Sequence, residues 1–226
     1  MLDERGLVVL SEGACFLPSP PLGGEGKGEG GKSMEKGNVR QACFLDVETT
    51  GLSARTEEVV ELAVCMFDFK RDSGEIIQVV DTYVGLREPG VPISAAAARV
   101  HGLRLEDLCG KRLDHGRVEK IIQTADFIVA HNARFDRSFV SKLIPLSEKK
   151  QWLCSMSGVD WYGKGFSSRG LQNLLMSHGI CTKRAHRAED DVRAALTLLG
   201  KRGHDGRTYF AELLRCITAE AANIAR

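Results

Sequence analysis

The stretch CFLDVETTGL (43–52) places two acidic residues, Asp46 and Glu48, inside an otherwise apolar run. Side chains of a strand alternate between its faces, so these two share a face and lie about 6–7 Å apart along the strand. Carboxylates at this spacing repel each other unless a proton or a cation lies between them. An exposed edge strand with two solvated acids is the alternative, but the turn at 49–51 favours a ligand site at the strand's carboxyl end.

A third acid, Asp136, interrupts an apolar helical pattern. In HNARFDRSFVSKL (131–143), positions 136, 139, 140 and 143 have the spacing of one helix face, and the last three are apolar. A charge on such a face needs a partner. Arg134 or Arg137 can supply one, but the alignment of Asp136 with the core face favours a functional role.

A fourth acid follows His186 in AHRAEDDVRAALTLLG (185–200). Acids are common in a first helical turn because of the helix macrodipole. On the helical wheel, Asp190 falls on a mostly polar stripe, whereas Asp191 aligns with apolar positions that face the core. We therefore take Asp191 as the candidate, and His186 lies on the loop just before this helix.

The four candidate acids, Asp46, Glu48, Asp136 and Asp191, suit hard divalent cations such as Mg²⁺ or Mn²⁺ far better than zinc. Their charge can hold two such ions, which together activate water and stabilise the leaving oxygen in phosphodiester hydrolysis. Histidine can accept the proton of such a water at neutral pH, and His186 is the candidate for this role.

The elements that must position these residues follow from apolar patterns. Short connections between the first three predicted strands favour an antiparallel meander, and later helices alternate with strands, which predicts an α/β architecture with a mixed sheet. A C-terminal amphipathic helix is expected to pack on its own domain rather than dock a partner. Strands are predicted at 42–48, 59–69, 76–84 and 125–130, and helices at about 133–143, 168–178, 189–200 and 207–226.

Composition narrows the class of protein further. The 226 residues are 43% hydrophobic and 27% charged with a net charge of +1, an ordinary globular composition that does not by itself indicate a nucleic-acid partner. Seven cysteines without C-x-x-C spacing favour free thiols over a zinc site or a disulfide framework. With no apolar run near the ~20 residues of a membrane span and no secretory signal, we expect a cytoplasmic protein that does not bind a membrane.

The chain is expected to have three parts. Residues 1–36 are rich in Gly and Pro, lack hydrophobic periodicity and are predicted to be disordered. Residues 37–200 form the predicted catalytic domain, and 201–226 the C-terminal helix. As a further hypothesis, Met34 is the true start, in which case the segment before it is not native.

Three segments in order, DVETTGL, HNARFD and HRAEDD, resemble the motifs of the DEDDh 3′–5′ exonucleases. VHGL (100–103) resembles a further segment of members similar to the epsilon proofreading subunit of DNA polymerase III. The resemblance covers about residues 41–200. It implies a ribonuclease H-like fold with a mixed five-stranded sheet flanked by helices, two Mg²⁺ or Mn²⁺ ions, and release of 5′-mononucleotides from 3′ ends.

Carried over by position, the resemblance makes Asp46, Glu48, Asp136 and Asp191 the metal-binding acids and His186 the general base. The tyrosine branch of the family would require Tyr at position 187, which is Arg here. Further residues are expected to contact substrate, with structural roles as the alternative: Thr49, Thr50, Gly51, Leu52, His101, Asn132 and Phe135. Basic side chains that can follow the phosphate backbone, with scattered surface charge as the alternative, are Lys164, Arg169, Lys183, Arg184 and Arg187.

The leading prediction is a metal-dependent 3′–5′ exonuclease for single-stranded ends, with DNA favoured and a DNA polymerase subunit as a possible partner. An RNA-trimming exonuclease of the same family shares the chemistry and stays open as an alternative. A non-catalytic module that docks a polymerase through 207–226 is disfavoured, because all five catalytic residues are present.

Overall fold

The computed structural model describes residues 38–182 and 184–224. The predicted tail at 1–36 and the alternative start at Met34 therefore lie outside the described residues, as does Lys183. The elements in chain order are β1 Val39–Thr49, β2 Val59–Lys70, β3 Ile76–Leu86, α1 Ala95–His101, α2 Leu105–Leu108, α3 His115–Thr124, β4 Phe127–Ala130, α4 Ala133–Leu143, η1 Pro145–Lys149, β5 Gln151–Cys154, α5 Leu171–Ser177, α6 Ala188–Gly200 and α7 Tyr209–Ile224.

One five-stranded sheet with the order β3-β2-β1-β4-β5 organises the domain. β1 pairs antiparallel with β2, and β2 pairs antiparallel with β3. On its other side β1 pairs parallel with β4, which pairs parallel with β5. The predicted meander and mixed five-stranded sheet are therefore confirmed, and β1, which carries Asp46 and Glu48, is the central strand.

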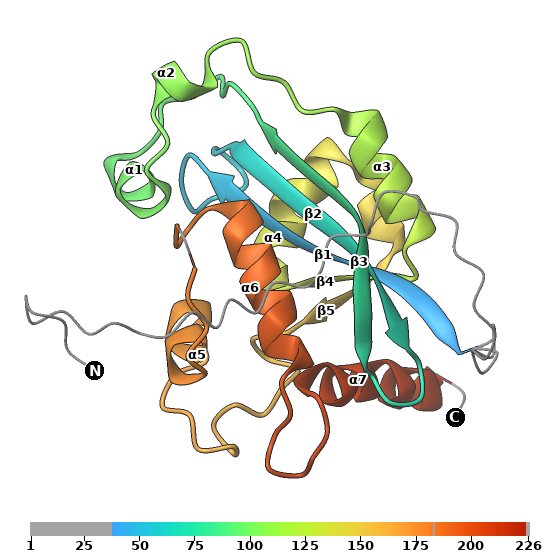
Figure 1. Cartoon of the computed structure of the whole chain (residues 1–226). Helices are drawn as coiled ribbons and strands as arrows, with labels where there is room; N and C mark the ends of the chain where they lie inside the picture. The colour runs from blue at the N-terminus through green and yellow to red at the C-terminus, as the bar shows by residue number, and fades with distance from the viewer. Residues whose placement is uncertain (1–37, 183, 225–226) are drawn as a thin grey trace, which may run out of the picture. The chain divides into compact units, whose positions relative to one another are not determined.

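Helices cover both faces of this sheet, with α6 crossing one face and α3 and α4 lying on the other (Figure 1). Even-numbered residues of β1, such as Phe44, pack under α5, α6 and α7. Odd-numbered residues, such as Leu45 and Val47, pack under α3 and α4. Because both faces are buried, most of β1 is apolar. Its two acids, Asp46 and Glu48, lie toward the carboxyl end of the strand, where these side chains are only partly buried.

The fifth strand could not be located from the sequence. β5 has only the four residues Gln151–Cys154, and its burial pattern shows no clear alternation. It forms because β4 offers a parallel edge, with Phe127 opposite Gln151 and Ala130 opposite Cys154. Tertiary pairing therefore decides this element, whereas local pattern was enough for the longer strands.

The predicted C-terminal helix is α7, which begins at Tyr209. Phe210 and Leu213 are fully buried, and the Phe210 ring packs edge-on against Phe67 and Phe69 of β2 at 5.4 and 5.2 Å between centroids. The amino-terminal half of α7 thus completes the core on the α6 side of the sheet. None of the helices that the structure describes has the length and hydropathy required to cross a bilayer.

Candidate active site

A cavity of about 370 Å³ opens beside the carboxyl end of β1. Side chains from β1, α4, α5 and α6 and from the loop that carries His186 meet in it, although they are up to 145 residues apart in the sequence. The lining residues are Asp46, Val47, Glu48, His131, Phe135, Asp136, Gly170, Leu171, Gln172, Asn173, His186 and Asp191.

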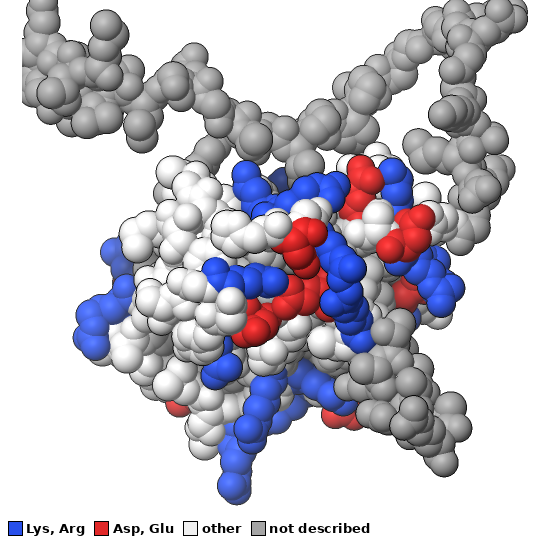
Figure 2. All heavy atoms as spheres, turned by 90° about the horizontal axis from the view of Figure 1, so that it is seen from below, with Lys and Arg blue, Asp and Glu red and all other residues white. Residues whose placement is uncertain are grey.

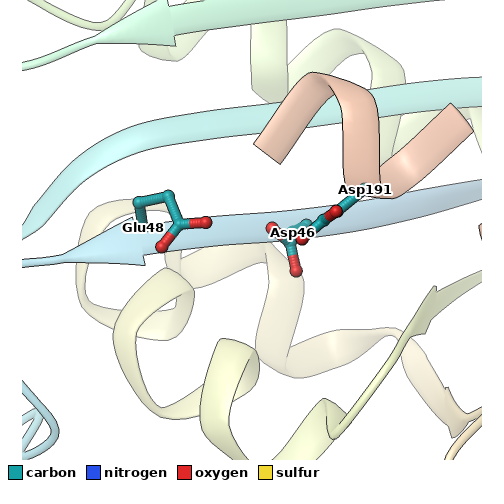
Figure 3. A group of neighbouring side chains, drawn as sticks. All are labelled: Asp46, Glu48 and Asp191. Carbon is teal, nitrogen blue, oxygen red and sulfur yellow. The ribbon is translucent and has the colours of Figure 1, made fainter. Parts of the chain in front are cut away.

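Three of the predicted acids, Asp46, Glu48 and Asp191, each present a carboxylate oxygen to a common space. These three oxygens all lie within 4.8 Å of one another. Figure 3 shows Asp46 and Glu48 extending from β1 and Asp191 reaching toward Asp46 from α6. Asp190, the neighbouring acid, pairs instead with Arg184 at 3.2 Å on the outside of the helix.

Asp136 approaches the same cavity from α4 and is only 2% exposed. Pairing between β1 and β4 ends at Phe44 and Val129, so the backbone of β1 beyond that point is open on the β4 side. The Val47 N–H there forms a hydrogen bond with the Asp136 carboxylate. The short length of β4 is therefore what lets α4 bring its acid to the end of the central strand.

Burial and mutual repulsion make these carboxylates resist ionisation. Burial raises the pKa of Glu48 to about 8, and the charges of Asp191 and Glu61 add to this rise. Burial also raises the pKa of Asp136 to about 8. The pKa of Asp46 is raised well above its usual range by burial and then by Asp136 and Glu48. Without a counter-charge, ionisation of all four acids at neutral pH has a high electrostatic free energy.

This donor set fits a hard divalent cation. Carboxylate oxygens are the preferred protein ligands of Mg²⁺ and Mn²⁺, and a cation would offset the repulsion that raises these pKa values. The described residues in the group offer oxygen and no sulfur. Asp46, Glu48 and Asp191 are the side chains placed to hold such an ion, with Asp136 at the edge of the same cavity.

His186 lines the cavity from an exposed loop and adopts a positive φ of 60°. Few non-glycine residues adopt this left-handed conformation, and histidine is among those that tolerate it. His186 also acts on Asp191: its charge and a backbone hydrogen bond oppose the rise that burial causes in the pKa of Asp191. The histidine and the acid of the third motif thus lie next to each other.

A buried ion pair fixes the start of α6, and the sequence reading did not single out its acid, Glu61. This residue is 2% exposed on β2, opposite Glu48 in the register. Its carboxylate accepts two hydrogen bonds from the guanidinium of Arg187, at 2.9 and 2.6 Å, and a third from the backbone N–H of Ala188 at 3.1 Å. Glu61 interrupts the apolar run of β2, and this interruption is the signal that could have identified it.

Two further polar residues hold the cavity wall and were also not singled out. Gln172 of α5 donates to Asp191 Oδ1 at 2.8 Å. His131 joins the ends of β4 and β5 through Ser155 Oγ at 2.9 Å, and its second ring nitrogen contacts the Arg169 carbonyl oxygen at 2.9 Å. His131 belongs to the HNARFD segment, so its motif was visible, but Gln172 carried no local signal.

The turn after β1 is held by its own hydrogen bonds. Thr49 and Thr50 are buried, and the Thr50 hydroxyl donates to Glu57 Oε2 at 2.5 Å. A side chain at Gly51 would collide with Glu57, since an added Cβ would lie 2.9 Å from its carboxyl carbon. Leu52 at the tip is 88% exposed and free to contact a ligand.

The remaining predicted substrate contacts occupy different environments. His101 is buried outside the cavity lining, with Nε2 3.3 Å from the Thr49 carbonyl oxygen and Nδ1 accepting from the Leu103 N–H, an arrangement that supports the turn. Asn132 is exposed at the start of α4 with a positive φ of 77° and does not line the cavity. Phe135 does line it. Substrate contact by these residues stays a prediction.

The basic residues expected to follow a phosphate backbone are largely engaged within the fold. Lys164 pairs with Glu212 at 2.6 Å, Arg184 with Asp190 at 3.2 Å and Arg187 with Glu61 at 2.6 Å. Arg169 is exposed. For Lys164 and Arg187, which are mostly buried with their partners, the structure therefore favours a role inside the fold.

The carboxylates gathered at the carboxyl end of the central strand form a candidate site for a divalent cation. The family model described as Exonuclease (RNase_T) matches residues 43–199, and the chain belongs to this exonuclease family. The predicted family resemblance is confirmed by this match, which also covers all five predicted catalytic residues.

Individual relatives agree with this family. The chain is 30% identical to the DNA polymerase III subunit epsilon of Treponema pallidum (strain Nichols) over 166 residues, 68% of this chain and 72% of that protein. It is 28% identical to the PolC-type DNA polymerase III of Listeria innocua over 165 residues, which are 70% of this chain but only 11% of that protein.

Solved structures confirm the ribonuclease H-like fold class. A structure of exonuclease I has a TM-score of 0.56 with 19% identity, covering 71% of this chain and 40% of that one. Exonuclease I of E. coli in complex with a dT13 oligonucleotide has a TM-score of 0.55 with 18% identity, covering 70% and 40% of the two chains.

The buried pair between Arg187 and Glu61 predicts a large stability difference. Arg187→Leu leaves the Glu61 carboxylate buried without its partner, and we expect a loss of about 3 kcal/mol in the free energy of unfolding, measured by urea denaturation. Arg184→Leu removes an ion pair whose arginine is 58% exposed and should cost less than about 1 kcal/mol. Equal costs for the two variants would contradict the structural role of the buried pair.

The raised pKa of Glu48 predicts how stability depends on pH in the metal-free protein. The folded state retains a proton that the unfolded chain, with a glutamate pKa near 4.5, has already released. The free energy of unfolding should therefore fall by on the order of 5 kcal/mol between about pH 4.5 and 8 and then level off. Denaturation with a chelator present measures this slope, and added Mg²⁺ or Mn²⁺ should reduce it. Glu48→Gln is the control, and an unchanged slope in that variant would contradict the assignment.

Proposed function

We propose that this chain is a metal-dependent 3′–5′ exonuclease that releases 5′-mononucleotides from single-stranded 3′ ends, with DNA as the favoured substrate. The observation that carries the proposal is the convergence of Asp46, Glu48 and Asp191 oxygens within 4.8 Å in an open cavity, in a chain of the exonuclease family. Asp136 and His186 lie in the same lining.

The acids Asp46, Glu48, Asp136 and Asp191 are proposed to hold two divalent cations, Mg²⁺ or Mn²⁺. Ions held there would activate water and stabilise the charge on the leaving oxygen. Val47 and Gln172 hold the carboxylates of Asp136 and Asp191 in place by hydrogen bonds, so the acids do not rely on the ions alone for their orientation.

His186 is proposed to accept the proton of the attacking water. Its side chain is exposed to solvent at the mouth of the cavity, so the proton can pass on to bulk water. The Asp191 carboxylate lies beside it, and the charge of His186 opposes the rise in the pKa of Asp191. Leu52 and Phe135 are proposed to contact the terminal bases, and the backbone of Thr49, Thr50 and Gly51 the terminal nucleotide.

The substrate and partner are proposed from the relatives and the shape of the site. Exonuclease I of E. coli, which shares the fold, has been seen with a dT13 oligonucleotide, and an epsilon subunit of DNA polymerase III is 30% identical in sequence over 166 residues. On the face seen in Figure 2, Lys and Arg side chains surround a group of acidic ones and do not form a continuous basic stripe. Binding of a nucleic-acid strand on that face would therefore depend on local contacts. The proposal also includes a role in the cytoplasm in association with a DNA polymerase.

The test uses matched DNA and RNA oligonucleotides labelled at either end. Asp46→Ala should reduce Mg²⁺-dependent release of mononucleotides by more than about 1,000-fold, because it removes a ligand at the centre of the acid group. Asp190→Ala, which removes an acid outside the cavity, is the matched control and should retain activity. Full activity of Asp46→Ala refutes the site, loss of label from the 5′ end first refutes the polarity, and a preference for RNA favours the RNA-trimming alternative.

His186→Ala separates proton transfer from metal binding. We expect kcat to fall by about 100- to 10,000-fold while the Mn²⁺ affinity, measured by calorimetry, stays within a few-fold. His115→Ala, at an exposed position that begins α3, is the control and should change neither quantity. An equal loss of Mn²⁺ binding in His186→Ala would remove its assignment as the base.

A further inference from the structure

A second cavity, of about 280 Å³, lies further along α4. Phe135 and Asp136 line the first cavity, whereas Phe139 and Leu143 line the second. The rings of Phe135 and Phe139 are in contact, with 5.0 Å between their centroids. From Asp136 to Leu143 the helix rises about 10 Å, a distance that one or two nucleotides of an extended strand can span.

Basic side chains predominate among the charged groups of this second cavity, which are Arg55, Arg87, Lys142, Glu57 and Glu58. Arg87 and Glu58 offset each other through an ion pair of 2.7 Å. A hydrogen bond from the Gly90 N–H and the contact with Arg87 lower the pKa of Glu58, so this pair is fully charged at neutral pH.

The other two basic side chains retain unused hydrogen-bond donors. Among the interactions of the described residues, Arg55 has no hydrogen bond or ion pair, and its side chain is exposed. Lys142 donates one hydrogen bond to the Ala54 carbonyl oxygen, and this bond holds the loop between β1 and β2 against α4. Two hydrogens of the Lys142 ammonium group remain available to a ligand. The Glu57 carboxylate opposite them already accepts a hydrogen bond from Thr50.

We propose that this second cavity binds a phosphodiester group of the substrate strand, one or two nucleotides before the bond that is cut at the first cavity. The Arg55 guanidinium offers a planar pair of donors that matches two phosphate oxygens, and Lys142 adds a positive charge. The inference rests on the proposed exonuclease function, because it assumes that the 3′ end of the substrate strand already lies in the first, acidic cavity.

The test compares two substrates that differ in the number of phosphodiesters. The p-nitrophenyl ester of thymidine 5′-phosphate has one phosphodiester and cannot reach the second cavity, whereas a single-stranded oligodeoxynucleotide can. For Arg55→Gln, KM for the oligonucleotide should rise about tenfold with little change in kcat, while both constants for the ester stay unchanged. Lys142→Gln should act in the same direction, and its unfolding midpoint shows whether the loop stays folded.

A binding measurement makes the outcome independent of catalysis. Fluorescence anisotropy with the same oligonucleotide and Ca²⁺ should show affinity about tenfold weaker for Arg55→Gln, with a log–log salt slope smaller by about 0.7. Arg71→Gln, at an exposed position in the turn that follows β2, is the matched control and should match the wild type. If Arg55→Gln binds the oligonucleotide with the affinity and salt slope of the wild type, this inference is wrong. It is also wrong if Arg55→Gln loses activity equally on the oligonucleotide and on the p-nitrophenyl ester. An inactive wild type that binds the strand through Arg55 would overturn the proposed function alone.

Discussion

Repulsion among carboxylates at the end of β1 is the constraint on which the rest of the site depends. Asp46, Glu48, Asp136 and Asp191 come from one strand and two helices, and burial raises the pKa of each. For Asp46 and Glu48 the charges of the neighbouring acids raise the pKa further. A fold that gathers such groups stores unfavourable electrostatic energy in the absence of a counter-charge. The natural use of this arrangement is to bind cations, since bound ions turn the repulsion into affinity.

The fold balances this repulsion with contacts that hold the acids where they are. The positive charge of Arg187 lowers the pKa of Glu48, and its guanidinium also pairs with Glu61. The Arg187 side chain therefore stabilises both carboxylates. The same pair anchors the start of α6, which carries Asp191. The α6 side of the cavity is therefore anchored by a buried ion pair, whereas the His186 loop just before α6 is exposed. Such a division suits the roles proposed for Asp191 as a metal ligand and for His186 as the general base.

Much of the site could be predicted from local patterns, but its supporting residues could not. Asp46 and Glu48 interrupted a strand pattern, and Asp136 and Asp191 fell on the core faces of helices, so each was visible within about ten residues of sequence. Gln172 was not, because nothing in the pattern of α5 shows that it will face Asp191. His101 resembled a pocket residue by its motif, yet it is buried beside Thr49 and supports the turn there.

By itself, the sequence determined the strand meander, the helices α4, α5, α6 and α7, the family, and the candidate acids with their histidine, because periodicity and motif spacing are local properties. Only the tertiary structure decided which partners these residues meet. It placed Glu61 against Arg187 across 126 residues and formed β5 on the edge of β4. It also left Val47 open to Asp136, because the pairing of β1 with β4 ends before that residue. Such contacts join residues far apart in the chain, and a pattern within one segment holds no information about its partner.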